Sequence, residues 1–142
     1  SVKKEVQARK KQIIKQFREE FDFCKVAFFY DYQTRKVLDK NWSNTVLRDT
    51  GQYVNANYSQ QFEHFYLVDF GKSYLPDQKQ QFSGVVIRDT SLQVLKPPFP
   101  NKIASHSSYQ FLGLNRTIKK QVKELNSRLR EFYLEHRPFE GE

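Results

Sequence analysis

Hydrophobic positions recur with a helical period at both ends of the chain and with a period of two between them. Near the N-terminus, apolar residues recur at helical spacing along 1–22, at Val6, Ile13, Phe17 and Phe21, and Ile14 widens the stripe. Basic and polar residues fill the other positions, so this stretch is predicted to be an amphipathic helix. A second helix is predicted over 115–137, with an N-cap at Asn115 or Thr117 and an end before Pro138. Its apolar stripe consists of Ile118, Val122, Leu125, Leu129 and Phe132.

The middle segment, 23–112, is rich in alternating apolar residues and turn signals, which is typical of β-strands. The apolar run 62–71 is predicted to be a central strand, because both of its faces carry large side chains. Further strands are predicted at 24–32, 37–38, 85–87, 92–95 and 109–112, and a hairpin is predicted at 45–58, with its turn at Asp49-Thr50-Gly51.

This order of elements predicts an α+β fold: an antiparallel sheet of about five strands flanked by N-terminal and C-terminal amphipathic helices. At 142 residues the chain suits a single domain over 1–142, with an N-terminal helix at 1–22, a β-rich core at 23–112 and a C-terminal helix at 115–137. Thirteen phenylalanines and eight tyrosines indicate that aromatic rings fill much of the core.

Two pentapeptides echo each other at an offset of forty residues. Val46-Leu47-Arg48-Asp49-Thr50 matches Val86-Ile87-Arg88-Asp89-Thr90. The residues between them do not align, so we interpret the echo as two strands that reach similar turns rather than as a duplicated unit.

The chain carries a net charge of +8 and has an isoelectric point of about 9.6, which favours a polyanionic partner. The excess is spread along the sequence: residues 1–23 contain seven basic and four acidic side chains, and no basic tail stands out. A chain with a single cysteine, Cys24, cannot form an internal disulfide. This slightly favours localisation in a reducing, intracellular compartment. Cys24 falls on the apolar side of the predicted strand, so we expect a buried, inert thiol. No apolar run is long enough to span a membrane.

No pattern points to catalysis, to a cofactor or to a metal. The three histidines are far apart, and no pair has ligand spacing. No Gly-x-Ser-x-Gly elbow is present. We therefore expect a protein that is not an enzyme.

The favoured hypothesis is a non-catalytic binding or assembly domain, or a subunit of a complex, that engages an acidic or macromolecular partner; a protein partner or homo-oligomer is expected. The first alternative is binding of RNA or single-stranded nucleic acid through a basic, aromatic sheet face, for which Lys25, Tyr58, Tyr66 and Lys72 are further candidates. The second alternative is a soluble sensor or secretion-apparatus domain of a membrane protein. The candidate partner-binding residues are basic or aromatic: Lys10, Lys11, Arg18, Tyr30, Tyr32, Arg48, Tyr53, Arg88, Lys120 and Lys123.

Overall fold

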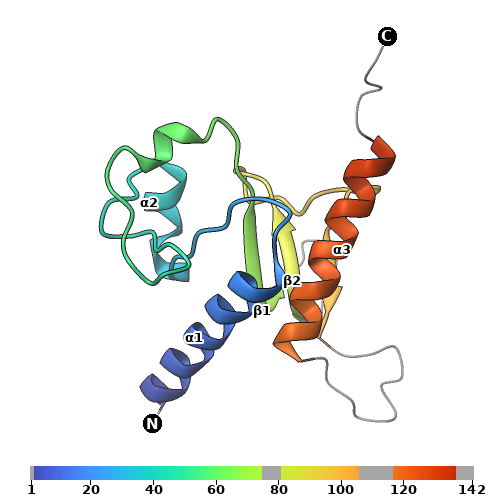
Figure 1. Cartoon of the computed structure of the whole chain (residues 1–142), viewed down its shortest axis with the longest axis horizontal. Helices are drawn as coiled ribbons and strands as arrows, with labels where there is room; N and C mark the ends of the chain where they lie inside the picture. The colour runs from blue at the N-terminus through green and yellow to red at the C-terminus, as the bar shows by residue number, and fades with distance from the viewer. Residues whose placement is uncertain (1, 75–80, 106–116, 137–142) are drawn as a thin grey trace. The chain divides into compact units, whose positions relative to one another are not determined.

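The computed structural model describes residues 2–74, 81–105 and 117–136, which fall in two compact units, Ser1–Phe65 and Tyr66–Glu142 (Figure 1). The described residues form three α-helices, two short 3-10 helices and one antiparallel sheet of three strands. The predicted α+β class is confirmed. The prediction of about five strands is wrong for these residues.

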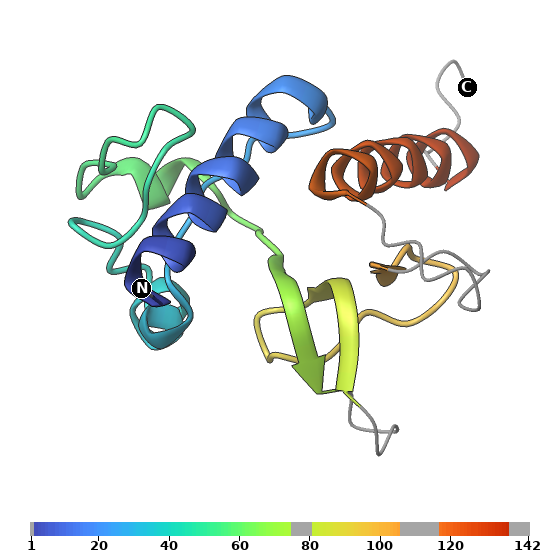
Figure 2. The same cartoon turned by 90° about the horizontal axis from the view of Figure 1, so that it is seen from below.

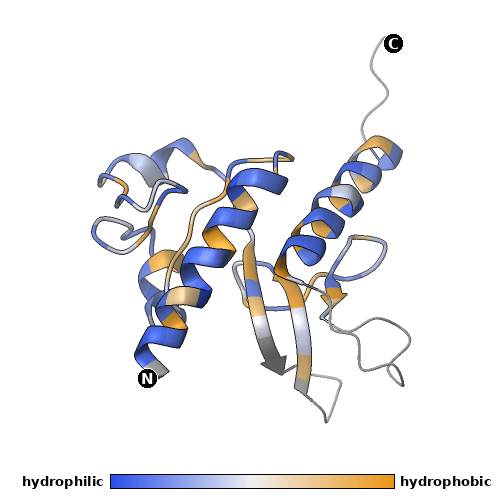
Figure 3. Ribbon diagram, turned by 60° about the horizontal axis from the view of Figure 1, so that its bottom comes forward, coloured by the Kyte–Doolittle hydropathy of each residue, from blue (hydrophilic) through white to orange (hydrophobic). Residues whose placement is uncertain are grey.

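Both predicted terminal helices are present. Helix α1 spans Val2–Glu20 and α3 spans Ile118–His136. Thr117 caps α3, because its Oγ1 accepts the backbone N–H of Lys120 at 3.2 Å. Each helix has an apolar stripe and a polar remainder, which Figure 3 shows as orange and blue sides. The apolar spacing was sufficient to locate these helices because a 3.6-residue period repeats over five turns in each.

In the first unit, Ser1–Phe65, irregular backbone replaces most of the predicted strands. The segment predicted as a strand at 24–32 contributes one isolated bridge, between Phe28 and Leu47. The hairpin predicted at 45–58 keeps its turn and one bridge between its arms, Leu47 with Tyr53, but forms no strands. The predicted return strand at 37–38 belongs instead to helix α2, Thr34–Leu38, which follows the 3-10 helix η1, Asp31–Gln33. The alternating apolar residues here are mostly rings, and they pack against other rings rather than forming a ladder.

Trp42 is the centre of an aromatic cluster in this unit. Its ring centroid lies 6.2 Å from Tyr58, 6.0 Å from Phe62 and 5.5 Å from Phe65. The indole Nε1 donates a hydrogen bond of 2.8 Å to the carbonyl oxygen of Val37, which satisfies its only polar atom. Aromatic pairs of this kind contribute about 0.5–1.5 kcal/mol each beyond the area they bury. The cluster therefore ties η2, Tyr58–Gln61, to α2 without a sheet.

The second unit, Tyr66–Glu142, contains the sheet, in the order β1-β2-β3 (Figure 2). Strand β1 spans Leu67–Tyr74, β2 spans Gln81–Arg88 and β3 spans Lys102–Ala104. The central strand is β2. The prediction that 62–71 forms the central strand is wrong, because its first residues belong to the aromatic cluster of the other unit and its last residues form the edge strand β1.

Strand β2 is central because three successive apolar residues, Val85, Val86 and Ile87, are buried on both faces of the sheet. Helix α3 contacts β2 and β3, and its Val122, Leu125 and Leu129 are buried. The predicted strand at 92–95 contributes only a bridge between Arg88 and Val94. The strand predicted at 109–112 lies outside the described residues.

Helix α3 also closes the outer edge of the short strand β3. Ile87 N–H donates to Asn101 O and Ser105 N–H donates to Ser83 O, so the odd-numbered residues of β2 face β3. Lys102 pairs with Val86, an even-numbered residue, and therefore directs its carbonyl away from β2. The guanidinium of Arg128 donates to that carbonyl at 3.2 Å. A helix side chain thus takes the place of a fourth strand at this position.

The two echoing pentapeptides lead into the same type of turn, but in different registers. The first turn closes with Arg48 N–H to Gln52 O, and the second closes with Asp89 N–H to Gln93 O. The structural offset is therefore 41 residues rather than 40. The positions with positive φ are Gly51 at 87° and Leu92 at 65°. Identical residues of the two pentapeptides occupy different positions in the two turns. This supports similar turn chemistry rather than duplication of a unit.

We expect Gly84→Ala to destabilise the second unit by about 3 kcal/mol, because a Cβ at Gly84 would fall on the carbonyl oxygen of Ile103 and within 2.9 Å of Ser105 N. Its φ of 141° adds strain for any other residue. Gly51→Ala is the control: its Cβ would meet nothing within 4 Å, so only the backbone penalty of about 1 kcal/mol remains. Denaturant unfolding of the two variants measures the difference, and equal losses would contradict the close approach of β2 and β3.

We expect Leu92→Gly to stabilise the second turn by about 0.5 kcal/mol, because glycine removes most of the left-handed penalty but adds freedom to the unfolded chain. Leu92→Ala keeps the penalty and serves as control. Thermal unfolding should rank the glycine variant above both the wild type and the alanine variant, and a glycine variant below the wild type would refute the account of this turn.

Candidate binding surface

A hollow of about 290 Å³ lies within the first unit, and ten side chains line it. We call it the basic hollow and define it by these residues: Phe17, Arg18, Phe21, Cys24, Lys25, Val26, Phe28, Arg48, Asp49 and Tyr58. The apolar members are buried or half-buried, whereas the charged members are exposed. The hollow thus has an apolar floor and a charged rim, with three basic groups and one acidic group.

Two of the predicted partner-binding residues, Arg18 and Arg48, meet at this rim. Arg18 comes from the last turn of α1, and its Nη1 donates to the carbonyl oxygen of Asp49 at 3.3 Å. Arg48 begins the tight turn that Gly51 completes, and its guanidinium lies 5.0 Å from the centroid of the Tyr58 ring. The hydrogen bond and the ring contact hold both guanidinium groups in place, which lowers the entropy that they lose on binding an anion.

The floor of the hollow is made of rings that the sequence indicates only as core. Phe17 lies 5.4 Å from Phe21 and 5.8 Å from Phe28, measured between ring centroids. Tyr58 is held from behind by Trp42, which therefore positions the ring on which Arg48 rests. The sequence gives no signal that these rings border an open space, because a helical stripe looks the same whether its last turn is covered or not.

Cys24 lies in this hollow and is exposed, so the expectation of a buried thiol is wrong. The alternating pattern that implied burial does not form a strand here. The surrounding rings still cover part of the thiol, and this partial burial raises the pKa of Cys24 above its ordinary value. At neutral pH the side chain is therefore a neutral thiol, which makes it a slow nucleophile.

A second group of candidates meets beside α1. The ammonium of Lys10 donates to the hydroxyl oxygen of Tyr30 at 2.7 Å, and Gln7 Nε2 donates to the same oxygen at 3.4 Å. The ring of Tyr32 stacks on Tyr30 with centroids 5.7 Å apart and is 81% exposed. The hydrogen bond from Lys10, followed by that from Gln7, lowers the pKa of Tyr30, because both donors stabilise the phenolate.

The remaining candidates are dispersed. Lys11 lies on a shallow face of α1 beside Lys4 and Ala8, and Tyr53 is exposed after the first turn. Lys120 and Lys123 are exposed on α3, in the second unit. The rings expected on a sheet face, including Tyr30, Tyr32, Tyr53 and Tyr58, lie outside the strands. A stacking platform on the sheet is therefore not formed by these residues.

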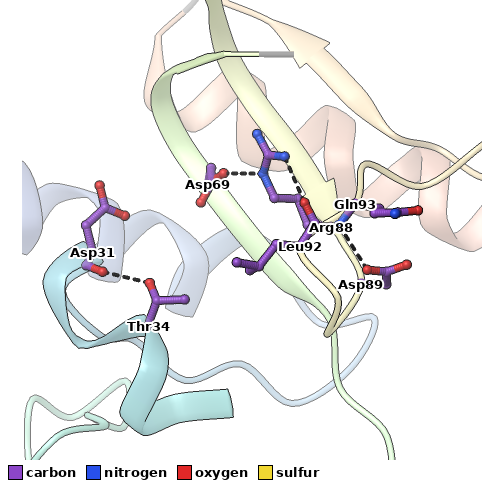
Figure 4. Close-up of polar contacts among 7 residues, drawn as sticks. All are labelled: Asp31, Thr34, Asp69, Arg88, Asp89, Leu92 and Gln93. Carbon is purple, nitrogen blue, oxygen red and sulfur yellow. Dashed lines mark hydrogen bonds and ion pairs between the residues drawn. The ribbon is translucent and has the colours of Figure 1, made fainter. Parts of the chain in front are cut away.

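Arg88 has a structural role in the second unit (Figure 4). Its Nε lies 2.7 Å from Asp69 Oδ2, across the β1–β2 pair, and its Nη1 donates to Leu92 O at 3.1 Å. Asp89 Oδ1 accepts the N–H groups of Ser91 and Gln93 in the same turn. These bonds join the β1–β2 pair to the turn that follows, and they hold the guanidinium of Arg88 against the sheet.

Within 2–74, 81–105 and 117–136, no three His, Cys, Asp or Glu side chains gather as a metal site requires. In the same ranges, no helix combines the length and the apolar content needed to cross a membrane. Comparison of the chain with protein-family models, with curated proteins and with solved structures finds no match in any of the three.

We expect Tyr30 to ionise at a lower pH than an ordinary tyrosine, and Lys10→Met to move its pKa back toward about 10. Because the folded-state pKa is lowered, the ionised tyrosine stabilises the fold above its ordinary pKa, and this contribution is lost as the pH falls through the lowered value. Ultraviolet absorbance of the phenolate measures the titration, and Tyr30→Phe assigns the early phase. Lys11→Met removes the same charge from another face of α1 and should leave the curve unchanged; an equal shift would point to general charge instead.

Proposed function

We propose that the protein is a non-catalytic binding module whose basic hollow captures an acidic segment of a protein partner. The observation that carries this proposal is the placement of Arg18, Lys25 and Arg48 around one apolar floor. Three basic groups against Asp49 alone leave the rim with an excess of positive charge. Carboxylates bound there would gain charge-assisted hydrogen bonds from these cations.

The contacts of the rings favour an acidic protein segment over a nucleic acid. Base stacking requires open ring faces. In the hollow, Arg48 lies over Tyr58, and Trp42 and Phe62 pack against the same ring. Outside the hollow, Tyr32 covers Tyr30. Tyr32 itself is an exposed ring that nucleic-acid binding would use together with Lys10, and the candidate rings Tyr53 and Tyr66 are exposed as well.

The charge of the whole chain supports an acidic partner but does not select the hollow. Each of the two units has twelve basic and eight acidic side chains. Net charge therefore accelerates encounter with any polyanion. Specific binding must come from local arrangement, and this is why the test compares basic residues at the rim with basic residues elsewhere in the same unit.

We expect the intact chain to bind a fluorescein-labelled peptide of alternating glutamate and phenylalanine, and Arg48→Gln to weaken binding about tenfold, the equivalent of about 1.4 kcal/mol. Arg18→Gln should weaken it comparably. Arg35→Gln is the matched control, because Arg35 is exposed in α2, lies in the same unit and does not line the hollow. Fluorescence anisotropy at low and physiological salt gives the affinities.

Three outcomes decide the proposal. Selective loss in the rim variants supports it. Equal loss in Arg35→Gln and Arg48→Gln, or no binding at low salt, refutes it. Tighter binding of a single-stranded oligonucleotide of the same charge, with a steeper salt dependence that Tyr32→Ala abolishes, replaces it with the nucleic-acid function.

A further inference from the structure

We propose that the basic hollow recognises an aromatic side chain of the partner. The ring inserts into the apolar floor, and carboxylates on both sides of it bind at the rim. This inference rests on the proposed function and adds a specificity to it. A surface that bound acidic segments by charge alone would need only exposed lysines and arginines. The structure instead places three cations around rings.

The size of the hollow fits one large side chain. Its volume is about 290 Å³, near the lower limit for small-molecule sites, whereas a cavity of about 150 Å³ already accepts benzene. A phenyl or phenol group with its adjoining backbone therefore fills the space.

The floor is chemically suited to a ring. Phe17 meets Phe21 in a tilted geometry and Phe28 in an edge-on geometry, which are arrangements that aromatic pairs prefer. Phe17 is buried, so the half-buried rings of Phe21 and Phe28 supply the aromatic surface that an inserted ring would contact. The sulfur of Cys24 adds a soft, polarisable contact of the kind that aromatic rings accept. Val26 completes the floor with an apolar surface that carries no hydrogen-bonding side chain.

The rim of the hollow determines which residues the partner would carry next to the inserted ring. Arg48 rests on Tyr58, and Arg18 is held by the carbonyl of Asp49, so both cations are positioned before a ligand arrives. Cations fixed beside an apolar opening favour acidic residues next to the inserted ring. The recognised class is therefore an aromatic residue within an acidic segment.

The test uses two peptides of equal length and charge, with glutamates around one central position that is Phe in one and Ala in the other. We expect the Phe peptide to bind the intact chain at least tenfold more tightly by fluorescence anisotropy. It should also slow the alkylation of Cys24 by iodoacetamide, a neutral reagent, in proportion to occupancy. Cys24 is the only cysteine, so the reaction reports on this hollow alone.

Variants at Cys24 provide the second measurement, because a larger side chain there should fill the hollow. Cys24→Phe should abolish the preference for the Phe peptide, because its own ring occupies the floor, while Cys24→Ser should retain it. Equal binding of both peptides, with unchanged alkylation of Cys24, refutes the aromatic specificity and leaves the proposed function standing. If neither of the two peptides binds, the proposed function itself is refuted.

Discussion

The aromatic cluster on Trp42 is the constraint on which the first unit depends. This unit has one long helix and little other regular structure, so backbone ladders do not fix its loops. Ring contacts do so instead: Trp42 holds Tyr58, Phe62 and Phe65, and its indole N–H is bound to the carbonyl of Val37. Packing of rings replaces strand pairing as the source of order, and the buried indole N–H of Trp42 does not oppose it because that group has its hydrogen-bond partner.

The same cluster gives the basic hollow its form. Tyr58 is fixed by Trp42 on one side and supports the guanidinium of Arg48 on the other. The tight turn through Gly51 brings Asp49 to Arg18 at the end of α1. A helix end, a turn and a 3-10 helix thus converge, and the site consists of residues that are far apart in the sequence. Two of its cations, Arg18 and Arg48, are thus in contact with other groups of the same unit.

The sequence was informative where a period extended over many residues and uninformative where it was short. Helices α1 and α3 and the apolar strand β2 were predictable, because their patterns reflect one buried face or a fully buried strand. The strand at 24–32 was predicted wrongly, since alternation of tyrosine and phenylalanine also results from rings packed in a cluster. Of the hairpin predicted at 45–58, the turn and one bridge across it are present, without regular strands. Strand β3 was missed, because three residues with one buried isoleucine carry almost no pattern. Arg18 and Arg48 were candidates by type, but their meeting depends on tertiary contacts that no spacing reveals.

The contact between Arg128 and the carbonyl of Lys102 has a consequence for solubility. An open strand edge is a template on which a strand from another molecule can add, and repetition of that step leads to aggregates. Here one outward carbonyl of β3, that of Lys102, already accepts a hydrogen bond from a charged side chain of α3. An incoming chain would have to displace that cation before it could pair at this position. The helix therefore hinders edge-to-edge pairing at Lys102, in addition to covering apolar residues of the sheet.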